Sequence, residues 1–322
     1  MHSGADRASG VVSARTPLFL ALIGLAAGGA TCKGDDLPPA PTKLDVPTAA
    51  EPAAAPTPAV PELEGVALSR VPPPRRADAI RLLQENFCYC GCARTLAGCL
   101  SDREACSCVE CSERVTEFIL GAFEQGMGTA QVESMVVEVF SEAYNAAPQD
   151  FDLADQPTLG PADAAHTLVE FADFRCGHCK DAYGELTAFV KGRSDVRLAY
   201  YYFPLRGFGE ISVLAARAAE AARRQGEFWA MAQRLYTYQT ELSESALRDH
   251  ARAVGLDMDR FEADLADPST LDAVMADKKV GTQVGVEGTP TIFVDGRPLG
   301  LPHGADGLRM RLAMEDDRTA CD

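Results

Sequence analysis

The strongest constraint on this chain is a cysteine pair, Cys176-Gly177-His178-Cys179, that directly follows an apolar run. Residues 167–171 have the composition of a buried strand, and a helical pattern covers about residues 177–191. A thiol at the amino terminus of a helix faces unpaired amide groups and the positive end of the helix dipole, and both favour the thiolate. We therefore expect the pKa of Cys176 to be lowered.

The spacing of the pair assigns different roles to its two sulfurs. From one turn inside the helix, Cys179 can attack a mixed disulfide formed on Cys176. We expect Cys176 to be the exposed nucleophile and Cys179 the resolving thiol, and a charged His178 to favour the thiolate further. A structural disulfide or half of a zinc site are the alternatives, but this half of the chain has no second matching pair.

Glu170 is an acid in the middle of the apolar run, six residues before Cys176. We expect this carboxyl group to be partly buried, with a raised pKa, and able to relay a proton to or from Cys179. The alternative is an edge-strand glutamate that faces water.

A second segment, Gly288-Thr289-Pro290, precedes another apolar run. In a cis Thr289–Pro290 bond, the backbone of Thr289 would turn toward the sulfurs and could pair with an extended substrate. Only about 5% of X–Pro bonds are cis. The sequence alone therefore does not predict a cis bond here.

The pattern of elements after residue 164 predicts an α/β fold. Strands are expected at 167–171, 196–203 and 291–294, and Asp295-Gly296 turns the last of these into a hairpin. Helices fill 210–280, with breaks at Gly226, Gly255 and Pro268, and a last helix covers about 304–315. The arrangement is an α/β unit that contains an all-helical insert.

Five motifs in this half of the chain resemble the DsbA-like thioredoxin-fold oxidoreductases in order and spacing. They are Val169-Glu170-Phe171, Cys176-Gly177-His178-Cys179, Tyr202-Phe203-Pro204-Leu205, Gln225-Gly226-Glu227-Phe228-Trp229 and Val286-Glu287-Gly288-Thr289-Pro290-Thr291. The resemblance implies a thioredoxin fold with a helical subdomain inserted between the second and third strands. It also implies that Cys176 attacks, Cys179 resolves, Pro290 is a cis-proline and Glu170 is the buried acid. The Gly-His dipeptide is that of protein disulfide isomerases, which suggests a potential near about −180 mV.

Composition indicates the compartment and excludes some partners. The net charge of −17 argues against nucleic acid as the main partner, because like charges repel. The 11 cysteines indicate an oxidising compartment or a metal site.

The amino terminus resembles a bacterial lipoprotein signal. Arg7 and Arg15 precede an apolar run from Pro17 to Ala30, which is too short to span a bilayer as a helix, and Cys32 follows. We expect residues 1–32 to be a signal segment and Cys32 to be lipidated, with plain secretion or an uncleaved anchor as the alternatives.

Residues 33–75 contain eleven of the 20 prolines and few large apolar residues, so we expect a disordered tether. Residues 76–147 form a second, Cys-rich helical module. In it, Ile80, Leu83 and Phe87 repeat at helical spacing, and two amphipathic helices follow the cysteines. We expect the thioredoxin-like domain to cover residues 160–315.

The cysteines of this module are Cys88, Cys90, Cys92, Cys99, Cys106, Cys108 and Cys111. The segment weakly resembles the thiol protein of cytochrome c maturation, which has one cysteine pair before a short helical bundle. Structural disulfides, redox exchange and an all-cysteine metal site are three interpretations, and the connectivity cannot be read from the sequence.

The leading prediction is a thiol–disulfide oxidoreductase of the bacterial envelope or periplasm. It exchanges disulfides with cysteine-containing envelope proteins, is served by a membrane or soluble redox partner, and needs no cofactor; Gly288 and Thr289 would bind substrate. The alternatives are a reductase acting in cytochrome c maturation and a non-catalytic peptide-binding or metal-binding protein.

Overall fold

The computed structural model describes residues 63, 65–90, 93–106 and 109–320. Residues 58–322 form one compact unit, and everything below refers to the described part of it. The expected signal segment, most of the expected tether, and Cys32, Cys92 and Cys108 lie outside the described residues.

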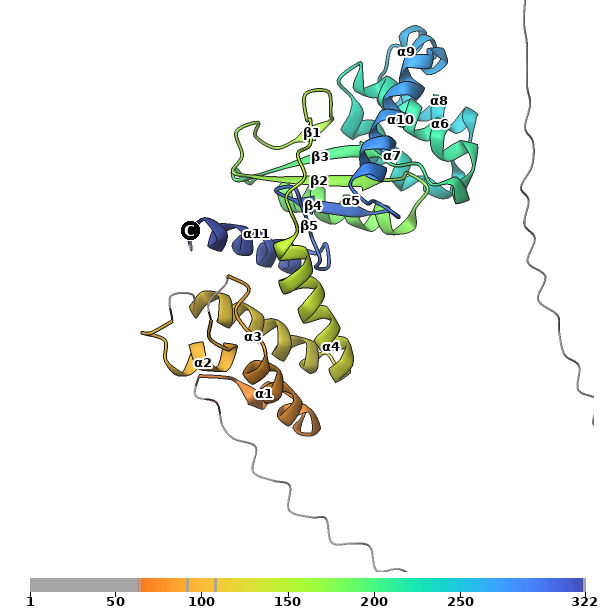
Figure 1. Cartoon of the computed structure of the whole chain (residues 1–322). Coiled ribbons are helices and arrows are strands. Elements are labelled where there is room, and N and C mark those ends of the chain that lie inside the picture. Colours follow the sequence, from red (N-terminus) through yellow and green to blue (C-terminus); the bar gives the residue numbers. More distant parts are fainter. Residues whose placement is uncertain (1–62, 64, 91–92, 107–108, 321–322) are drawn as a thin grey trace, which may run out of the picture. The chain divides into compact units, whose positions relative to one another are not determined.

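A mixed five-stranded sheet in the order β1-β3-β2-β4-β5 organises the carboxy-terminal region (Figure 1). β2 and β3 run parallel, and the other neighbouring strands run antiparallel. Helix α5 connects β2 to β3, as the parallel pairing requires. The elements are β1 (Thr158–Leu159), β2 (His166–Ala172), α5 (Gly177–Val190), β3 (Val196–Tyr202), β4 (Thr291–Val294) and β5 (Arg297–Pro298).

Successive residues of β2 face opposite sides of the sheet, as in any strand. Leu168 belongs to an apolar cluster with residues of α5 and of α11 (Ala305–Ala320). Val169 and Phe171 belong to another cluster, which residues near the end of α10 (Pro268–Gln283) complete. Glu170 lies two positions after Leu168 and therefore faces the α5 side.

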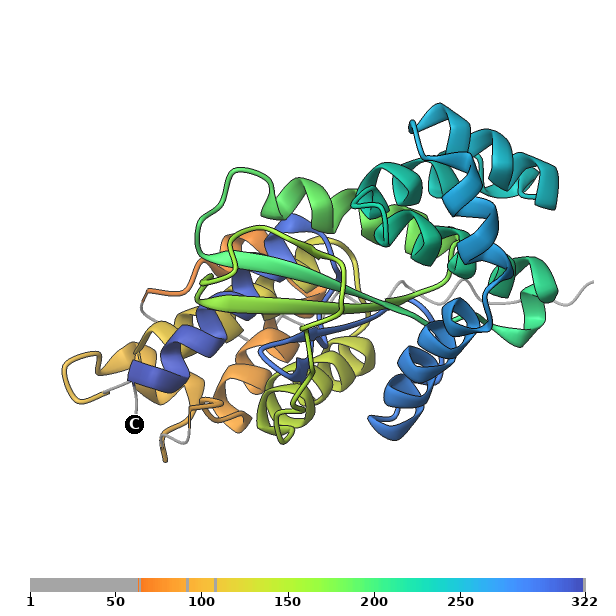
Figure 2. The same ribbon diagram turned by 90° about the horizontal axis from the view of Figure 1, so that it is seen from above.

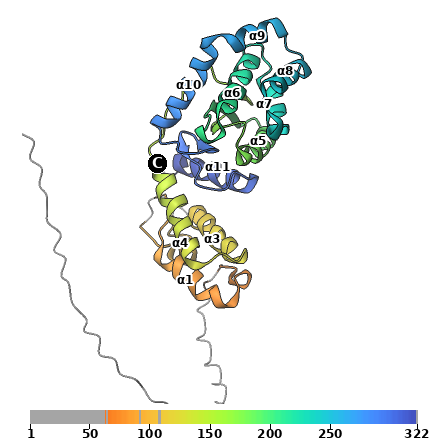
Figure 3. The ribbon, with the colours of Figure 1, turned by 90° about the vertical axis from the view of Figure 1, so that its right-hand side faces the viewer.

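The helical insert lies between β3 and β4 in the chain and beyond one end of the sheet (Figure 1 and Figure 2). Gly226 and Gly255 adopt positive φ angles of 82° and 83° at the helix breaks, a conformation that glycine tolerates best. Pro268 is the first residue of α10, which runs back from α9 toward the sheet (Figure 3). The other elements of the insert are η4 (Arg206–Phe208), α6 (Glu210–Arg223), α7 (Phe228–Thr237), η5 (Gln239–Glu241), α8 (Glu244–Ala253) and α9 (Met258–Ala266).

The strand and helix order confirms the expected fold class, an α/β thioredoxin fold with a helical insert. A helical amino-terminal region precedes this fold in the chain. That region packs around a buried core that includes Leu83, Leu96, Ile119 and Phe123. Its elements are η1 (Leu68–Arg70), η2 (Pro73–Arg75), α1 (Arg76–Glu85), α2 (Leu96–Ser101), α3 (Val109–Glu124), α4 (Thr129–Val136) and the π-helical turn η3 (Val137–Ala143).

The expected disordered tether does not extend to residue 75. Residues 68–70 and 73–75 form the short helices η1 and η2, and Val71 between them is buried in the core. Arg70 forms ion pairs with Glu117 and Glu124 of α3. Prolines at these positions therefore shape short turns instead of a solvated coil.

The assignment of Phe87 to a helical apolar stripe is wrong. Helix α1 ends at Glu85, the backbone of Asn86 is extended, and Phe87 pairs with Thr95 in an isolated bridge. Its side chain is 59% exposed. Spacing alone suggested a contact that the end of the helix prevents.

Candidate active site

Cys176 occupies the position that the sequence pattern predicts, at the amino terminus of a helix. It is the N-cap residue of α5, with an extended backbone, and its N–H donates a hydrogen bond to the carbonyl of Asp173 at 3.0 Å. Cys179 lies one turn inside α5, and both residues are thiols in this structure. The strand β2 and the helix α5 thus hold the pair at the end of the sheet.

The two sulfurs differ in burial less than expected. Cys176 is 5% exposed and Cys179 is 0% exposed, so the expectation that Cys176 is exposed is wrong. Cys176 is covered because it packs into the apolar cluster of the helical insert, and its Sγ donates a hydrogen bond to the carbonyl of Thr289 at 3.2 Å. Cys176 still remains the more accessible sulfur.

The loop before β4 closes over the pair. The Thr289–Pro290 bond is cis, as the family resemblance implied. Gly288 is exposed, and its carbonyl accepts a hydrogen bond from the hydroxyl of Thr291 at 2.8 Å. The sequence segments around Cys176 and around Thr289 are therefore neighbours in the fold.

Glu170 is a fully buried acid on the α5 side of the sheet. Its side chain is 0% exposed, and neither carboxylate oxygen has a hydrogen-bond partner among the described residues. Burial raises the pKa of Glu170 to about 8. Burial also raises the pKa of Cys179, and the negative charge of Glu170 adds to this shift. The charge of the Glu170 carboxyl group therefore affects the ionisation of the inner thiol.

His178 points into solvent at the first turn of α5. The structure thus brings together Cys176, Cys179, Glu170 and the Thr289–Pro290 loop, whereas His178 remains at the rim.

Two positioning residues escaped the sequence reasoning. The buried amide of Gln239 donates hydrogen bonds to the carbonyls of Phe174 and Cys176 at 2.8 and 2.7 Å. The carboxylate of Asp173 accepts hydrogen bonds from the N–H of Leu205 and from the hydroxyl of Ser212. An acid between two apolar residues, three positions before the cysteine, was a signal for Asp173, but no local pattern pointed to Gln239.

A groove with a volume of about 610 Å³ adjoins this site. Pro290 and Thr291 form part of its lining, opposite side chains of α4 and η3. The lining combines apolar and acidic groups, among them Met135, Glu138, Glu142 and Leu299. The groove is large enough for several side chains of an extended peptide.

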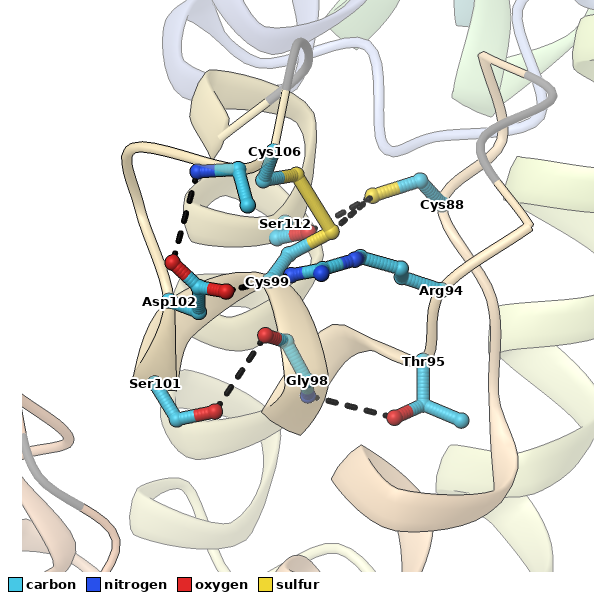
Figure 4. The surroundings of a disulfide bond; sticks show 10 residues. Cys88, Arg94, Thr95, Gly98, Cys99, Ser101, Asp102, Cys106 and Ser112 are labelled. Carbon is cyan, nitrogen blue, oxygen red and sulfur yellow. Dashed lines mark hydrogen bonds and ion pairs between the residues drawn. A yellow bond between two sulfur atoms is a disulfide. The ribbon is translucent and has the colours of Figure 1, made fainter.

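The helical amino-terminal region contains a separate group of sulfurs. Cys99 and Cys106 form a disulfide, and Cys88 lies beside it (Figure 4). Within the described ranges, no three His, Cys, Asp or Glu side chains are grouped to hold a metal ion. The disulfide interpretation of the cluster therefore has direct structural support at Cys99 and Cys106.

In this architecture, a cysteine pair that begins the helix after the first parallel strand and lies against a cis-proline loop defines a thioredoxin-fold thiol–disulfide oxidoreductase. The family model described as "Thioredoxin" matches residues 152–313, half of the chain. The chain belongs to this thioredoxin family.

Curated relatives share part of the chain. A Na(+)/H(+) antiporter NhaA of Herminiimonas arsenicoxydans is 40% identical over 176 residues, which cover 51% of this chain and 28% of the antiporter. Na(+)/H(+) antiporter NhaA 3 of Salinispora tropica is 36% identical over 149 residues, which cover 46% of this chain and 23% of the antiporter. The chain therefore spans less than a third of the length of these relatives.

Solved structures with partial similarity include two redox proteins. A thioredoxin-like oxidoreductase from Silicibacter pomeroyi is 29% identical, with a TM-score of 0.47, and the match covers 54% of this chain and 96% of that one. Oxidised BdbD from Bacillus subtilis is 22% identical, with a TM-score of 0.48, and the match covers 54% and 98% of the two chains.

None of the helices in the described residues is long and apolar enough to cross a membrane.

Proposed function

We propose that this chain exchanges disulfides with cysteine-containing proteins of the bacterial cell envelope, with Cys176 as the attacking sulfur and Cys179 as the resolving one. The observation that carries the proposal is the position of the Cys176 sulfur, at the start of α5 and 3.2 Å from the Thr289 carbonyl. A helix amino terminus stabilises a thiolate, and a thiolate is both the nucleophile and the better leaving group of exchange.

In the oxidising direction, the reaction begins with a disulfide between Cys176 and Cys179. A client thiolate attacks the Cys176 sulfur, a mixed disulfide forms, and Cys179 leaves as a thiolate. Glu170, with its raised pKa, is protonated at neutral pH and supplies a proton to Cys179. A second client thiolate then attacks the client sulfur of the mixed disulfide, so that the client gains a disulfide and the enzyme becomes a dithiol.

The groove beside Pro290 supplies the binding surface for the client in this proposal. An extended client segment along the loop before β4 would bring its cysteine to Cys176. The backbone of the exposed Gly288 and of the half-exposed Thr289 would pair with that segment. Glu138 and Glu142 on the groove wall favour clients with basic residues near the reacting cysteine.

The envelope location rests on cysteine content. Eleven cysteines, two of them joined in a disulfide away from the active pair, suit an oxidising compartment. Lipidation of Cys32 would hold the chain at a membrane, and a membrane or soluble redox partner would reoxidise it. No ion transport is proposed, since the match covers a minor part of the antiporters.

The decisive experiment compares two single variants of the full chain. Cys179→Ser retains the attacking sulfur but cannot resolve, so a mixed disulfide with a disulfide-containing client protein should accumulate and be visible as a mass adduct on Cys176. Cys176→Ser should form no adduct and lose both insulin reduction and oxidation of reduced client. Unchanged activity of Cys176→Ser would refute the assignment.

The reverse direction, reduction of apocytochrome c, is the second candidate, because Cys88 and Cys90 precede two helices of the amino-terminal region. The equilibrium potential of the Cys176–Cys179 couple against glutathione separates the two. A potential above about −200 mV would favour oxidation or isomerisation of clients, whereas a value near that of thioredoxin, about −270 mV, would favour reduction.

A further inference from the structure

We propose that a second surface, on the helical insert, binds an acidic, partly apolar segment of the protein with which Cys176 exchanges disulfides. This surface is a hollow of about 560 Å³ between the segment after β3, the first turns of α6 and one side of α10. It shares no lining residue with the groove beside Pro290. The identity of the partner rests on the function proposed above, whereas the binding chemistry rests on the hollow itself.

The hollow presents apolar side chains to solvent. Met275 of α10 lines it and is 42% exposed, and the half-buried Leu205 and Val213 belong to the same lining. Phe208 is 37% exposed in η4, the turn that also contributes Arg206 to the hollow. Apolar side chains that face one hollow, with charged groups around them, are typical of a protein-binding surface.

Positive charge determines the kind of partner. Arg206, Lys278 and Lys279 line the hollow together with a single carboxylate, that of Glu210. Among the described residues, none of these three cations forms an ion pair, whereas Arg248 of the same insert pairs with two glutamates. The hollow is therefore a local excess of positive charge on a chain whose net charge is −17.

Lys278 is held at the wall of the hollow without a carboxylate. Its ammonium group donates a hydrogen bond to the carbonyl of Pro204 and lies 5.6 Å from the centre of the Phe203 ring. Charges farther away than about 8 Å are largely screened at physiological ionic strength. The nearby cations, and not the net charge of the chain, therefore decide what binds here, and an acidic segment with apolar side chains complements both features.

The hollow is connected to the loop that carries the attacking sulfur. The N–H of Leu205 donates a hydrogen bond to the carboxylate of Asp173 at 2.6 Å, and the carbonyl of Asp173 accepts one from the N–H of Cys176 at 3.0 Å. The groove beside Pro290 contains Glu138 and Glu142, so its charge is opposite to that of the hollow. Together, the two surfaces favour a partner with basic residues near its cysteine and an acidic segment elsewhere, and they orient that partner.

Binding can be measured without exchange chemistry, in the full chain with Cys176→Ser and Cys179→Ser. The probe is a fluorescein-labelled peptide of Glu, Leu and Ser, and the control peptide has Gln in place of Glu. We expect the acidic peptide alone to bind in fluorescence anisotropy, and Arg206→Glu or Lys279→Glu to weaken its binding about tenfold. Lys191→Glu is the matched control, because this exposed lysine at the end of α5 lies outside the hollow, and it should leave binding unchanged.

Three outcomes of this measurement would overturn the inference. They are failure of the acidic peptide to bind, an equal loss of binding in Lys279→Glu and Lys191→Glu, and binding of phosphatidylglycerol vesicles in place of the peptide. The last result would identify a membrane surface as the occupant.

A second measurement tests the use of the hollow in exchange, with Cys176 and Cys179 intact. Two disulfide-containing model clients differ only in an acidic, leucine-containing tail on a flexible linker. The unmodified chain should react about tenfold faster with the tailed client, and Lys279→Glu should remove this difference without changing the rate for the tailless client. Equal rates for the two clients would refute the role of the hollow, whereas peptide binding without any exchange would refute the function proposed for Cys176.

Discussion

The side-chain amide of Gln239 lies 2.7 Å from the carbonyl oxygen of Cys176, although 63 positions separate the two residues in the chain. The same amide nitrogen binds the carbonyl of Phe174, and Arg175 donates in return to the carbonyl of Gln239. The turn η5 of the helical insert therefore holds the loop that ends β2 and starts α5. Through this contact, the insert determines where the first cysteine lies.

Removal of the Gln239 amide should weaken that loop. Gln239→Ala leaves the carbonyl of Phe174 without its donor and the carbonyl of Cys176 with only the N–H of Lys180, so we expect a loss of about 1–3 kcal/mol in the free energy of unfolding. We also expect a shifted equilibrium potential of the cysteine pair. Gln233→Ala is the matched control, because Gln233 is exposed on α7 and bonds to Thr237. An unchanged potential would limit Gln239 to a structural role.

Glu170 should make stability depend on pH in a defined window. Its folded-state pKa of about 8 lies above the ordinary value of 4.5, so the folded state binds more protons than the unfolded state between these values. Stability should therefore fall as the pH rises from about 4.5 to about 8. Glu170→Gln should remove this fall, with a gain of up to about 5 kcal/mol above pH 8 and none at pH 4.

The same variant separates stability from chemistry. If Glu170 supplies the proton to Cys179, Glu170→Gln should slow the step in which Cys179 leaves or attacks roughly 100-fold, as measured by stopped-flow mixing. The Glu227→Gln variant, at an exposed position, should alter neither the pH dependence of stability nor the rate of the exchange step. Normal exchange rates in Glu170→Gln would contradict the proton-relay role.

Gly281 should tolerate no side chain. A Cβ at this position of α10 would lie 2.7 Å from the ring of Phe203 and 2.9 Å from that of Phe171. We expect Gly281→Ala to destabilise the protein by about 1–3 kcal/mol in denaturant unfolding, because both rings are buried in the core and cannot move away from the added methyl group. Gly184→Ala in α5 meets nothing within 4 Å and should stabilise by about 0.5–1 kcal/mol. Equal effects would disprove the close approach of α10.

In the buried charge cluster around Glu315 of α11, loss of the anion should reduce stability more than loss of one cation. Glu315 pairs with Arg311, Arg297 and Arg318, whereas the Nε and Nη1 atoms of the fully buried Arg311 have no hydrogen-bond partner among the described residues. Glu315→Gln should cost about 3–5 kcal/mol, because it leaves buried cations without their anion. Arg311→Met should be neutral or stabilising, since Glu315 keeps two partners. A larger loss for Arg311→Met in thermal unfolding would reverse this interpretation.

Most of the carboxy-terminal fold could be predicted because its signals are local. The run at 167–171 lies within β2, Gly226 and Gly255 lie between helices, Pro268 begins α10, and Asp295-Gly296 connects β4 to β5. β1 is absent from the strands that the sequence predicted. Its two residues pair with β3, and only tertiary contact makes them a strand.

The site was predictable where one residue type determines a position. Cys176 and Cys179 needed only a strand and a helix around them, and the burial of Glu170 followed from its apolar neighbours. The near-complete cover over Cys176 could not be predicted, because residues of a distant insert supply it. The Cys99–Cys106 pairing was equally inaccessible, since seven cysteines allow many connectivities.

The 5% exposure of Cys176 limits which client conformations can reach its sulfur. The surface of a folded client cannot approach a sulfur that is recessed against the loop before β4. A flexible, unfolded client segment with its cysteine at a bend can approach it. In the proposed exchange, such a site would react with a client chain before it folds and would not reach the same cysteine after the client has folded.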